Sequence, residues 1–150
     1  MLEIKILPAE SAVTLKPFLL ELADHHNQVS INFRGLYPSI SVDEKVLVLQ
    51  QEISVGKTVA AVLTADHEEQ GFCVFSHTDD CGSIDYLYVR KELRGQGAGK
   101  LLMQWMLEQL ERLPVKLLEL KVVCGNHEAV RFYESCGFAA KTITLAKKLS

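Results

Sequence analysis

The stretch YLYVRKELRGQGAGKLL, residues 86–102, joins an apolar run typical of a β-strand to an amphipathic helix through a basic, glycine-rich turn. Gly95, Gly97 and Gly99 remove side chains from this turn, so its backbone N–H groups can close around an anion. The helix that follows directs the positive end of its dipole at the same place. Basic residues at positions 90, 91, 94 and 100 outnumber the one acidic residue, at 92. The stretch therefore predicts a site for a phosphate-bearing ligand.

Spacing excludes two other glycine-rich phosphate loops. A P-loop needs four residues between its first glycine and the Gly-Lys pair, followed by Ser or Thr. Here three residues separate Gly95 from Gly99, and Leu101 follows the lysine, so no hydroxyl is available for Mg²⁺. The dinucleotide fingerprint G-x-G-x-x-G fails because Lys100 and Leu102 take the position of its last glycine in the two alignments.

The pattern that fits is Arg-x-x-Gly-x-Gly, at Arg94, Gly97 and Gly99. It resembles the pyrophosphate loop of the GNAT (GCN5-related N-acetyltransferase) superfamily, which binds the diphosphate of acetyl-coenzyme A (acetyl-CoA). A second signature of that family, N-x-x-A-x-x-F-Y-x-x-x-G-F, is matched at every fixed position from Asn126 to Phe138. The two motifs stand in the family's order and at its separation, so the resemblance implies the family's fold.

Composition bounds the remaining function classes. The 150 residues suit one domain with a single core, and 48% hydrophobic residues argue against disorder. The net charge of −3 argues against nucleic-acid binding, and no apolar run has the length of a membrane span. No secretory signal opens the chain and the four cysteines lack C-x-x-C spacing, which predicts reduced thiols in a cytoplasmic protein. His25 and His26 have no ligand-like partners, so no metal is expected.

Hydrophobic periodicity predicts an α/β domain over residues 1–150 with a mixed sheet, and the resemblance implies that this sheet is mainly antiparallel and flanked by helices. We expect a helical region after the first strand, with Pro17 marking a restart or a kink, and a loop over 27–39. A capping box at Ser41 and Glu44 opens the second helix, and Asn126 caps the last one. Strands are expected at 2–7, 57–64, 70–77, 83–89, 117–123 and 142–149.

The resemblance implies acetyl transfer from acetyl-CoA to a primary amine of a small molecule or peptide, by direct attack in a ternary complex. In such enzymes the strand before the glycine loop and the strand after its helix splay apart, and their unpaired backbone groups bind the pantetheine arm. An N–H near Leu87 would also polarise the thioester carbonyl. The implied cofactor-binding residues are Leu87, Tyr88, Val89, Arg94, Gly95, Gln96, Gly97, Ala98, Gly99, Lys100, Asn126, Ala129, Phe132 and Tyr133.

The resemblance also implies candidates for proton transfer. Tyr133 matches the tyrosine that protonates the departing thiolate in many relatives, although a tyrosine there also suits helix packing. The general base is open between Asp85, on the strand before the loop, and Glu119, on the next strand; strict family spacing points to Ser83. An acyl-CoA sensor without turnover is the alternative function, and the presence of Tyr133 favours the enzyme.

The chain departs from the family after Phe138. Many members place a long hairpin there that closes one wall of the acceptor site, whereas only twelve residues follow here. The acceptor side is therefore expected to be open or completed by a partner subunit, as in a homodimer. The other wall is expected from residues 24–40, in which the candidate substrate contacts are His25, His26, Arg34 and Tyr37.

Overall fold

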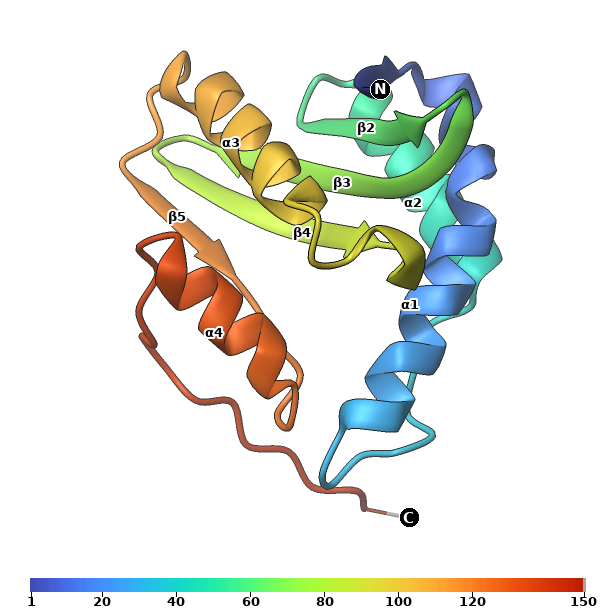
Figure 1. Cartoon of the computed structure of the whole chain (residues 1–150). Coiled ribbons are helices and arrows are strands. Elements are labelled where there is room, and N and C mark those ends of the chain that lie inside the picture. The colour runs from blue at the N-terminus through green and yellow to red at the C-terminus, as the bar shows by residue number, and fades with distance from the viewer. Residues whose placement is uncertain (150) are drawn as a thin grey trace.

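The computed structural model describes residues 1–149, and these contain one five-stranded sheet. Figure 1 shows how the sheet and the helices are arranged. The strands of the sheet are β1 (Leu2–Leu7), β2 (Thr58–Ala65), β3 (Glu68–Thr78), β4 (Cys81–Val89) and β5 (Leu117–Leu120), in the spatial order β1-β2-β3-β4-β5. The first three neighbouring pairs are antiparallel, whereas β4 and β5 are parallel. The predicted α/β fold with a mixed, mainly antiparallel sheet is confirmed.

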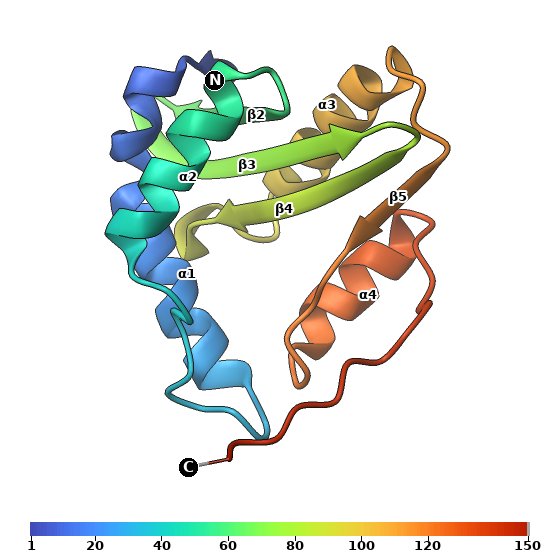
Figure 2. The ribbon, with the colours of Figure 1, turned by 180° about the vertical axis from the view of Figure 1, so that it is seen from behind.

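Helices cover both faces of the sheet (Figures 1 and 2). One face packs against η1 (Ala9–Leu15), α1 (Lys16–Val29) and α2 (Val42–Ser54), and the other against α3 (Ala98–Glu111) and α4 (His127–Ser135). Two apolar cores result, one on each side of the sheet. Phe72 and Val74 of β3 belong to the first core, and Cys73 and Phe75 to the second, as the alternation of a strand requires.

The helical region after β1 consists of two pieces. The 3₁₀ helix η1 ends at Leu15, and α1 begins at Lys16 with Pro17 in its first turn. Proline suits this place because its missing N–H would have no intrahelical partner there. The two alternatives for Pro17 are thus resolved as a restart. The helix also continues to Val29, so the loop begins later than residue 27.

Both predicted helix caps are present. Ser41 Oγ accepts a hydrogen bond from the backbone N of Glu44 at 3.2 Å, at the start of α2. Asn126 Oδ1 accepts one from the backbone N of Ala129 at 3.2 Å, at the start of α4. Each side chain satisfies an N–H group that the first turn of a helix leaves without a partner.

The predicted strand at 142–149 is wrong, because these residues form neither helix nor strand. The side chains of Ile143 and Leu145 are 86% and 91% exposed. The alternating pattern is present, but a strand also needs a hydrogen-bonded neighbour, and this segment has none within residues 1–149. The strand predicted at 117–123 ends at Leu120, because its pairing with β4 stops at Ile84.

Candidate active site

The strands β4 and β5 pair only over a short distance. Cys81–Ile84 of β4 lies against Leu117–Leu120 of β5, and then the two strands diverge (Figure 1). From Asp85 to Val89, β4 keeps β3 as its only strand neighbour in the described part of the chain. Backbone groups on the β5 side of this segment are therefore free to bind an extended ligand. This is the divergence of strands that the family resemblance implied, and it starts next to Asp85.

A β-bulge at Asp85 changes which side chains of β4 face each core. Val74 pairs with Tyr86 and Phe75 pairs with Ile84, so Asp85 is the extra residue. As a result Ile84 and Leu87 both pack in the core under α3, whereas Tyr86 packs in the core under α1 and α2. No sequence pattern indicated this bulge, because a bulge is defined by the pairing of two strands.

The glycine loop ends in a helix start with free backbone donors. After the single turn η2 (Lys91–Leu93) the chain reaches Gly97, whose φ of 81° is the left-handed conformation that glycine accepts readily. The first hydrogen bond of α3 runs from the backbone N of Leu101 to the Gly97 oxygen, at 3.0 Å. The N–H groups of residues 97–100 have no acceptor among the described residues. Together with the dipole of α3, these four donors suit a phosphate group.

The side chain of Arg94 turns back from the loop toward β4. Its Nε donates to the backbone oxygen of Val89 at 3.0 Å, and its guanidinium lies over the ring of Tyr88, 5.6 Å from the centroid. Tyr88 packs in the core of α1 and α2, so the charge of Arg94 lies on that side of β4. The positive charge of Arg94 is therefore tied to the end of β4, whereas the anion-binding donors of the loop belong to its backbone.

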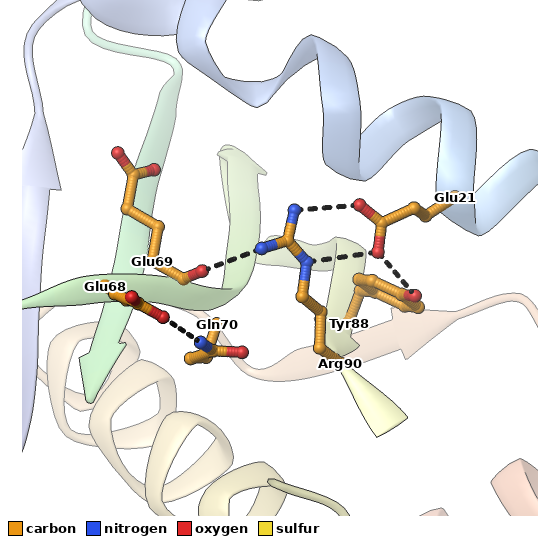
Figure 3. Close-up of polar contacts among 6 residues, drawn as sticks. All are labelled: Glu21, Glu68, Glu69, Gln70, Tyr88 and Arg90. Atoms are coloured by element: carbon orange, nitrogen blue, oxygen red, sulfur yellow. Dashed lines mark hydrogen bonds and ion pairs between the residues drawn. The ribbon is translucent and has the colours of Figure 1, made fainter. Parts of the chain in front are cut away.

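A network of Glu21, Tyr88 and Arg90 ties α1 to the end of β4 (Figure 3). Arg90 donates from Nε and one terminal nitrogen to the Glu21 carboxylate, at 3.1 and 2.9 Å, and Tyr88 Oη donates to the same group at 3.1 Å. The other terminal nitrogen of Arg90 donates to the backbone oxygen of Glu69, on β3, at 3.1 Å. The hydrogen bond from Arg90 lowers the pKa of Glu21 against the opposing effect of burial. Sequence reasoning missed this network, because its partners lie far apart in the chain and share no pattern.

The second motif lies against the first. The ring of Phe132, on α4, is 3.5 Å from where a Cβ atom on Gly99 would stand, so α4 packs on the start of α3. Tyr133 packs between Phe132 and Phe138, with ring centroids 5.3 and 5.9 Å away. Burial raises the pKa of Tyr133 to about 12, so its hydroxyl stays protonated at neutral pH.

The hydroxyl of Tyr133 is available to a ligand. It has no hydrogen-bond partner within residues 1–149, while no buried side-chain oxygen or nitrogen in that range lacks one, so solvent reaches it. The two interpretations of Tyr133 are therefore compatible, since the ring packs and the hydroxyl remains free. Whether the hydroxyl takes part in catalysis stays a prediction.

The two candidates for the general base, Asp85 and Glu119, lie close to Ser83, the position to which strict family spacing points. Asp85 accepts hydrogen bonds from Ser76 Oγ at 2.6 Å and Ser83 Oγ at 2.9 Å, and burial raises the pKa of its carboxyl against the effect of both hydroxyls. Ser83 stands opposite Glu119 in the β4–β5 register. Glu119 also accepts from Cys81 Sγ at 3.7 Å. Asp85, Ser83 and Glu119 thus form one polar strip where the strands diverge, on the face of the sheet that carries α1 and α2.

The end of α1 crosses to the turn that follows β5. The backbone N of Ile31 donates to the oxygen of Cys124 at 3.1 Å. A Cβ atom on Gly125 would stand 2.1 Å from the backbone oxygen of Val29, so only glycine permits this approach. The contact joins the α1 side of the molecule to the start of α4, beyond the point where β4 and β5 diverge (Figures 1 and 2).

The predicted substrate-contact residues lie in an ordered segment beside this contact. Asn27 holds the loop, because its Oδ1 accepts from the backbone N of Gly35 and Tyr37, and its Nδ2 donates to the Tyr37 oxygen at 2.7 Å. The rings of His26 and Tyr37 meet edge to face, with centroids 5.2 Å apart. Burial lowers the pKa of His26 to about 4, and burial also lowers that of His25, so both are neutral at pH 7.

The structure contains neither a metal centre nor a spanning helix in the part that it describes. No three His, Cys, Asp or Glu side chains gather there as ligands for a metal ion. Its helices are all too short or too polar to cross a membrane. The four cysteines are free thiols.

Comparison with known proteins gives consistent matches. The model of the acetyltransferase (GNAT) family matches residues 21–138. The [ribosomal protein bS18]-alanine N-acetyltransferase of Salmonella typhimurium is 31% identical over 81 residues, which are 54% of this chain and 55% of that protein. The match therefore spans about half the length of these curated relatives.

Solved structures resemble nearly the whole chain. A tetramutant of the BH1408 protein from Bacillus halodurans has a TM-score of 0.79 at 19% identity, over 98% of this chain and 99% of that one. A predicted acetyltransferase from Clostridium acetobutylicum, solved with acetyl-CoA, has a TM-score of 0.77 at 12% identity, over 99% and 97% of the two chains. At these identities the likeness concerns the fold.

Proposed function

The chain belongs to the acetyltransferase (GNAT) family, and from this premise we propose that it transfers the acetyl group of acetyl-CoA to a primary amine by direct attack in a ternary complex. One observation carries the proposal: the free backbone edge of Asp85–Val89 leads to the free N–H groups at the start of α3. An extended chain with a diphosphate at one end and a reactive group at the other fits this arrangement.

The residues present fit acetyl-CoA in three respects. The N–H groups of residues 97–100 suit the diphosphate, and the unpaired edge of β4 suits the amides of the pantetheine arm. Asn126 and Ala129 open α4, which packs on the start of α3. The Clostridium acetobutylicum structure, which shares the fold, was solved with acetyl-CoA, and this supports the same ligand here. When bound, acetyl-CoA supplies an acetyl group activated as a thioester.

The two proton transfers are assigned to residues on opposite faces of the sheet, at the point where β4 and β5 diverge. An ammonium acceptor must lose a proton before it attacks, and Asp85, whose pKa is raised, takes it directly or through water. Glu119, in the same polar strip, is the second base. Tyr133 is protonated at neutral pH and donates its proton to the departing thiolate.

The acceptor is proposed to be a cationic amine of a small molecule or of a peptide N-terminus. Two carboxylates in the strip, Asp85 and Glu119, favour a positively charged group on this face. The Salmonella relative is named as an alanine N-acetyltransferase of ribosomal protein bS18, which supports the inclusion of peptides that begin with alanine.

The test is release of free thiol from acetyl-CoA in the presence of candidate amines. The panel contains polyamines, amino acids, aminoglycosides and peptides that begin with alanine, each with an N-blocked counterpart as the matched control. We expect release with at least one free amine and none with its blocked form. Tight acetyl-CoA binding without release across the panel would instead indicate the sensor function.

A further inference from the structure

Residues 139–149 have the sequence of a strand but no strand neighbour in the described part of the chain. Their backbone forms no hydrogen bond with the remainder of the described chain. Ile143, Leu145 and Leu149 are 86%, 91% and 90% exposed, and threonines stand on both sides of Ile143. Such an alternating, β-branched segment leaves apolar surface in water that pairing with a sheet would bury. We refer to residues 139–149 as the tail.

The sheet has an unoccupied edge of the matching kind. β5 is its last strand, and the outer edge of β5 pairs with no other part of residues 1–149. An unpaired edge presents a row of backbone donors and acceptors that can accept a further strand. Leu117, on β5, is 48% exposed and adds apolar surface to this edge.

One ion pair already links the tail to β5. The tail contains Lys141, Lys147 and Lys148 and no acidic residue. Lys141 Nζ already lies 3.5 Å from a carboxylate oxygen of Glu119 on β5. Beyond Lys141, however, the tail runs past α4 toward the end of α1 and does not return to β5 (Figures 1 and 2).

We propose that the tail of a second copy pairs along the outer edge of β5, and that each copy supplies its tail to the other. A two-fold axis makes such an exchange self-complementary, because every copy offers one strand and one edge and the assembly closes as a dimer. The inference goes beyond the proposed function and does not require it. If that function holds, the added strand lies beside Glu119 and forms the acceptor wall on that side.

The first experiment measures molar mass by light scattering over a wide range of protein concentration. We expect twice the mass of one chain for the wild type and the mass of one chain for the variant Ile143→Lys/Leu145→Lys. Both side chains are exposed in the single chain, so this variant keeps its fold, which circular dichroism checks. The matched control is Leu47→Lys, a 64% exposed leucine on α2, which remains dimeric.

Hydrogen exchange then identifies the interface. At the amides of residues 117–123 that bond neither to β4 nor to Asp80 within the chain, we expect slow exchange in the wild type and fast exchange in the double-lysine variant. A wild type that is monomeric throughout overturns the proposal. So does a dimer that survives both lysines, or one in which residues 117–123 exchange as fast as in the variant. Thermal stabilisation by acetyl-CoA is measured on the same samples, so failure of the cofactor site is recognised separately.

Discussion

At the scale of single residues, the ring of Tyr133 is packed between two phenylalanines, whereas its hydroxyl has no hydrogen-bond partner among residues 1–149. Tyr133→Phe keeps the ring and removes the proton donor, so we expect kcat to fall by about 10²–10⁴-fold. The Kd for acetyl-CoA and the Tm should change little, because only one solvent-accessible hydroxyl is lost. Steady-state kinetics with an accepted amine checks this. An unchanged kcat, with chemistry rate-limiting, would assign Tyr133 to packing alone.

Asp85 leads to a prediction about pH. A base must be ionised, so kcat/KM should rise with pH through the raised pKa of the Asp85 carboxyl. The hydroxyl of Ser76 lowers this pKa, so Ser76→Ala should move the rise to higher pH. Asp85→Asn should remove it and reduce kcat/KM by at least about 10²-fold. Glu119→Gln is the matched control, and a rise that disappears in that variant instead would make Glu119 the base.

Local rules predicted what depends on neighbours in the sequence. Ser41 and Asn126 each satisfy an N–H group three residues ahead, so both caps were readable from spacing alone. The environment of Asp85 was not readable, because its hydrogen bond with Ser76 depends on the pairing of β3 with β4 and on a bulge in that pairing. The sequence therefore named the candidate residues, whose roles stay predictions, but it did not name their hydrogen-bond partners.

At the scale of elements, the Glu21–Arg90 pair joins α1 to the end of β4 through two hydrogen bonds. Arg90→Gln should lower the free energy of unfolding by about 1 kcal/mol, near the upper end for partly exposed pairs, because the contact is bidentate. Lys16→Gln breaks the more exposed pair with Asp43 and should cost less than about 0.5 kcal/mol. Urea unfolding of both variants makes the comparison, and equal losses would contradict a special role for the network.

The start of α3 can be tested with two substitutions of one glycine. Gly97→Asp places a carboxylate among the free N–H groups, whereas Gly97→Asn has nearly the same size and the same strain at a φ of 81° without the charge. Acetyl-CoA should raise the Tm of the wild type by binding the folded state. The rise should be lost with Asp and partly kept with Asn. Normal stabilisation of a folded Asp variant would show that the diphosphate binds elsewhere.

Helices and strands were predicted correctly where the hydrophobic pattern of the segment itself determines its structure. Periodicity located β1, α1 and α2, and the capping box gave the start of α2 correctly. The prediction of a strand in the tail was wrong, because an alternating pattern predicts a strand only if a neighbouring strand is present to pair with it. That neighbour is missing from residues 1–149, so the same alternation which misled the prediction also motivates the proposed dimer.

At the scale of the whole molecule, the fold brings together two motifs that are separate in the chain. The glycine loop and the α4 motif meet where Phe132 packs against Gly99, and the strands on either side of α3 diverge next to them. The motifs identified this region through their family resemblance. The contact between Ile31 and Cys124, which ties the α1 end to the other side of the opening, could not be read from either motif.

The divergence of β4 and β5 has a consequence for the order in which two substrates can bind. The sheet separates two groups of residues, and the gap between β4 and β5 connects its two faces. The glycine loop and Tyr133 lie on the face that carries α3 and α4, and the carboxylates of Asp85 and Glu119 lie on the other face. With the function proposed above, the acetyl donor and the amine acceptor bind from opposite faces of the sheet and meet at the gap between the two strands. Neither has to leave before the other can arrive, and an inhibitor that blocks one entrance leaves the other open.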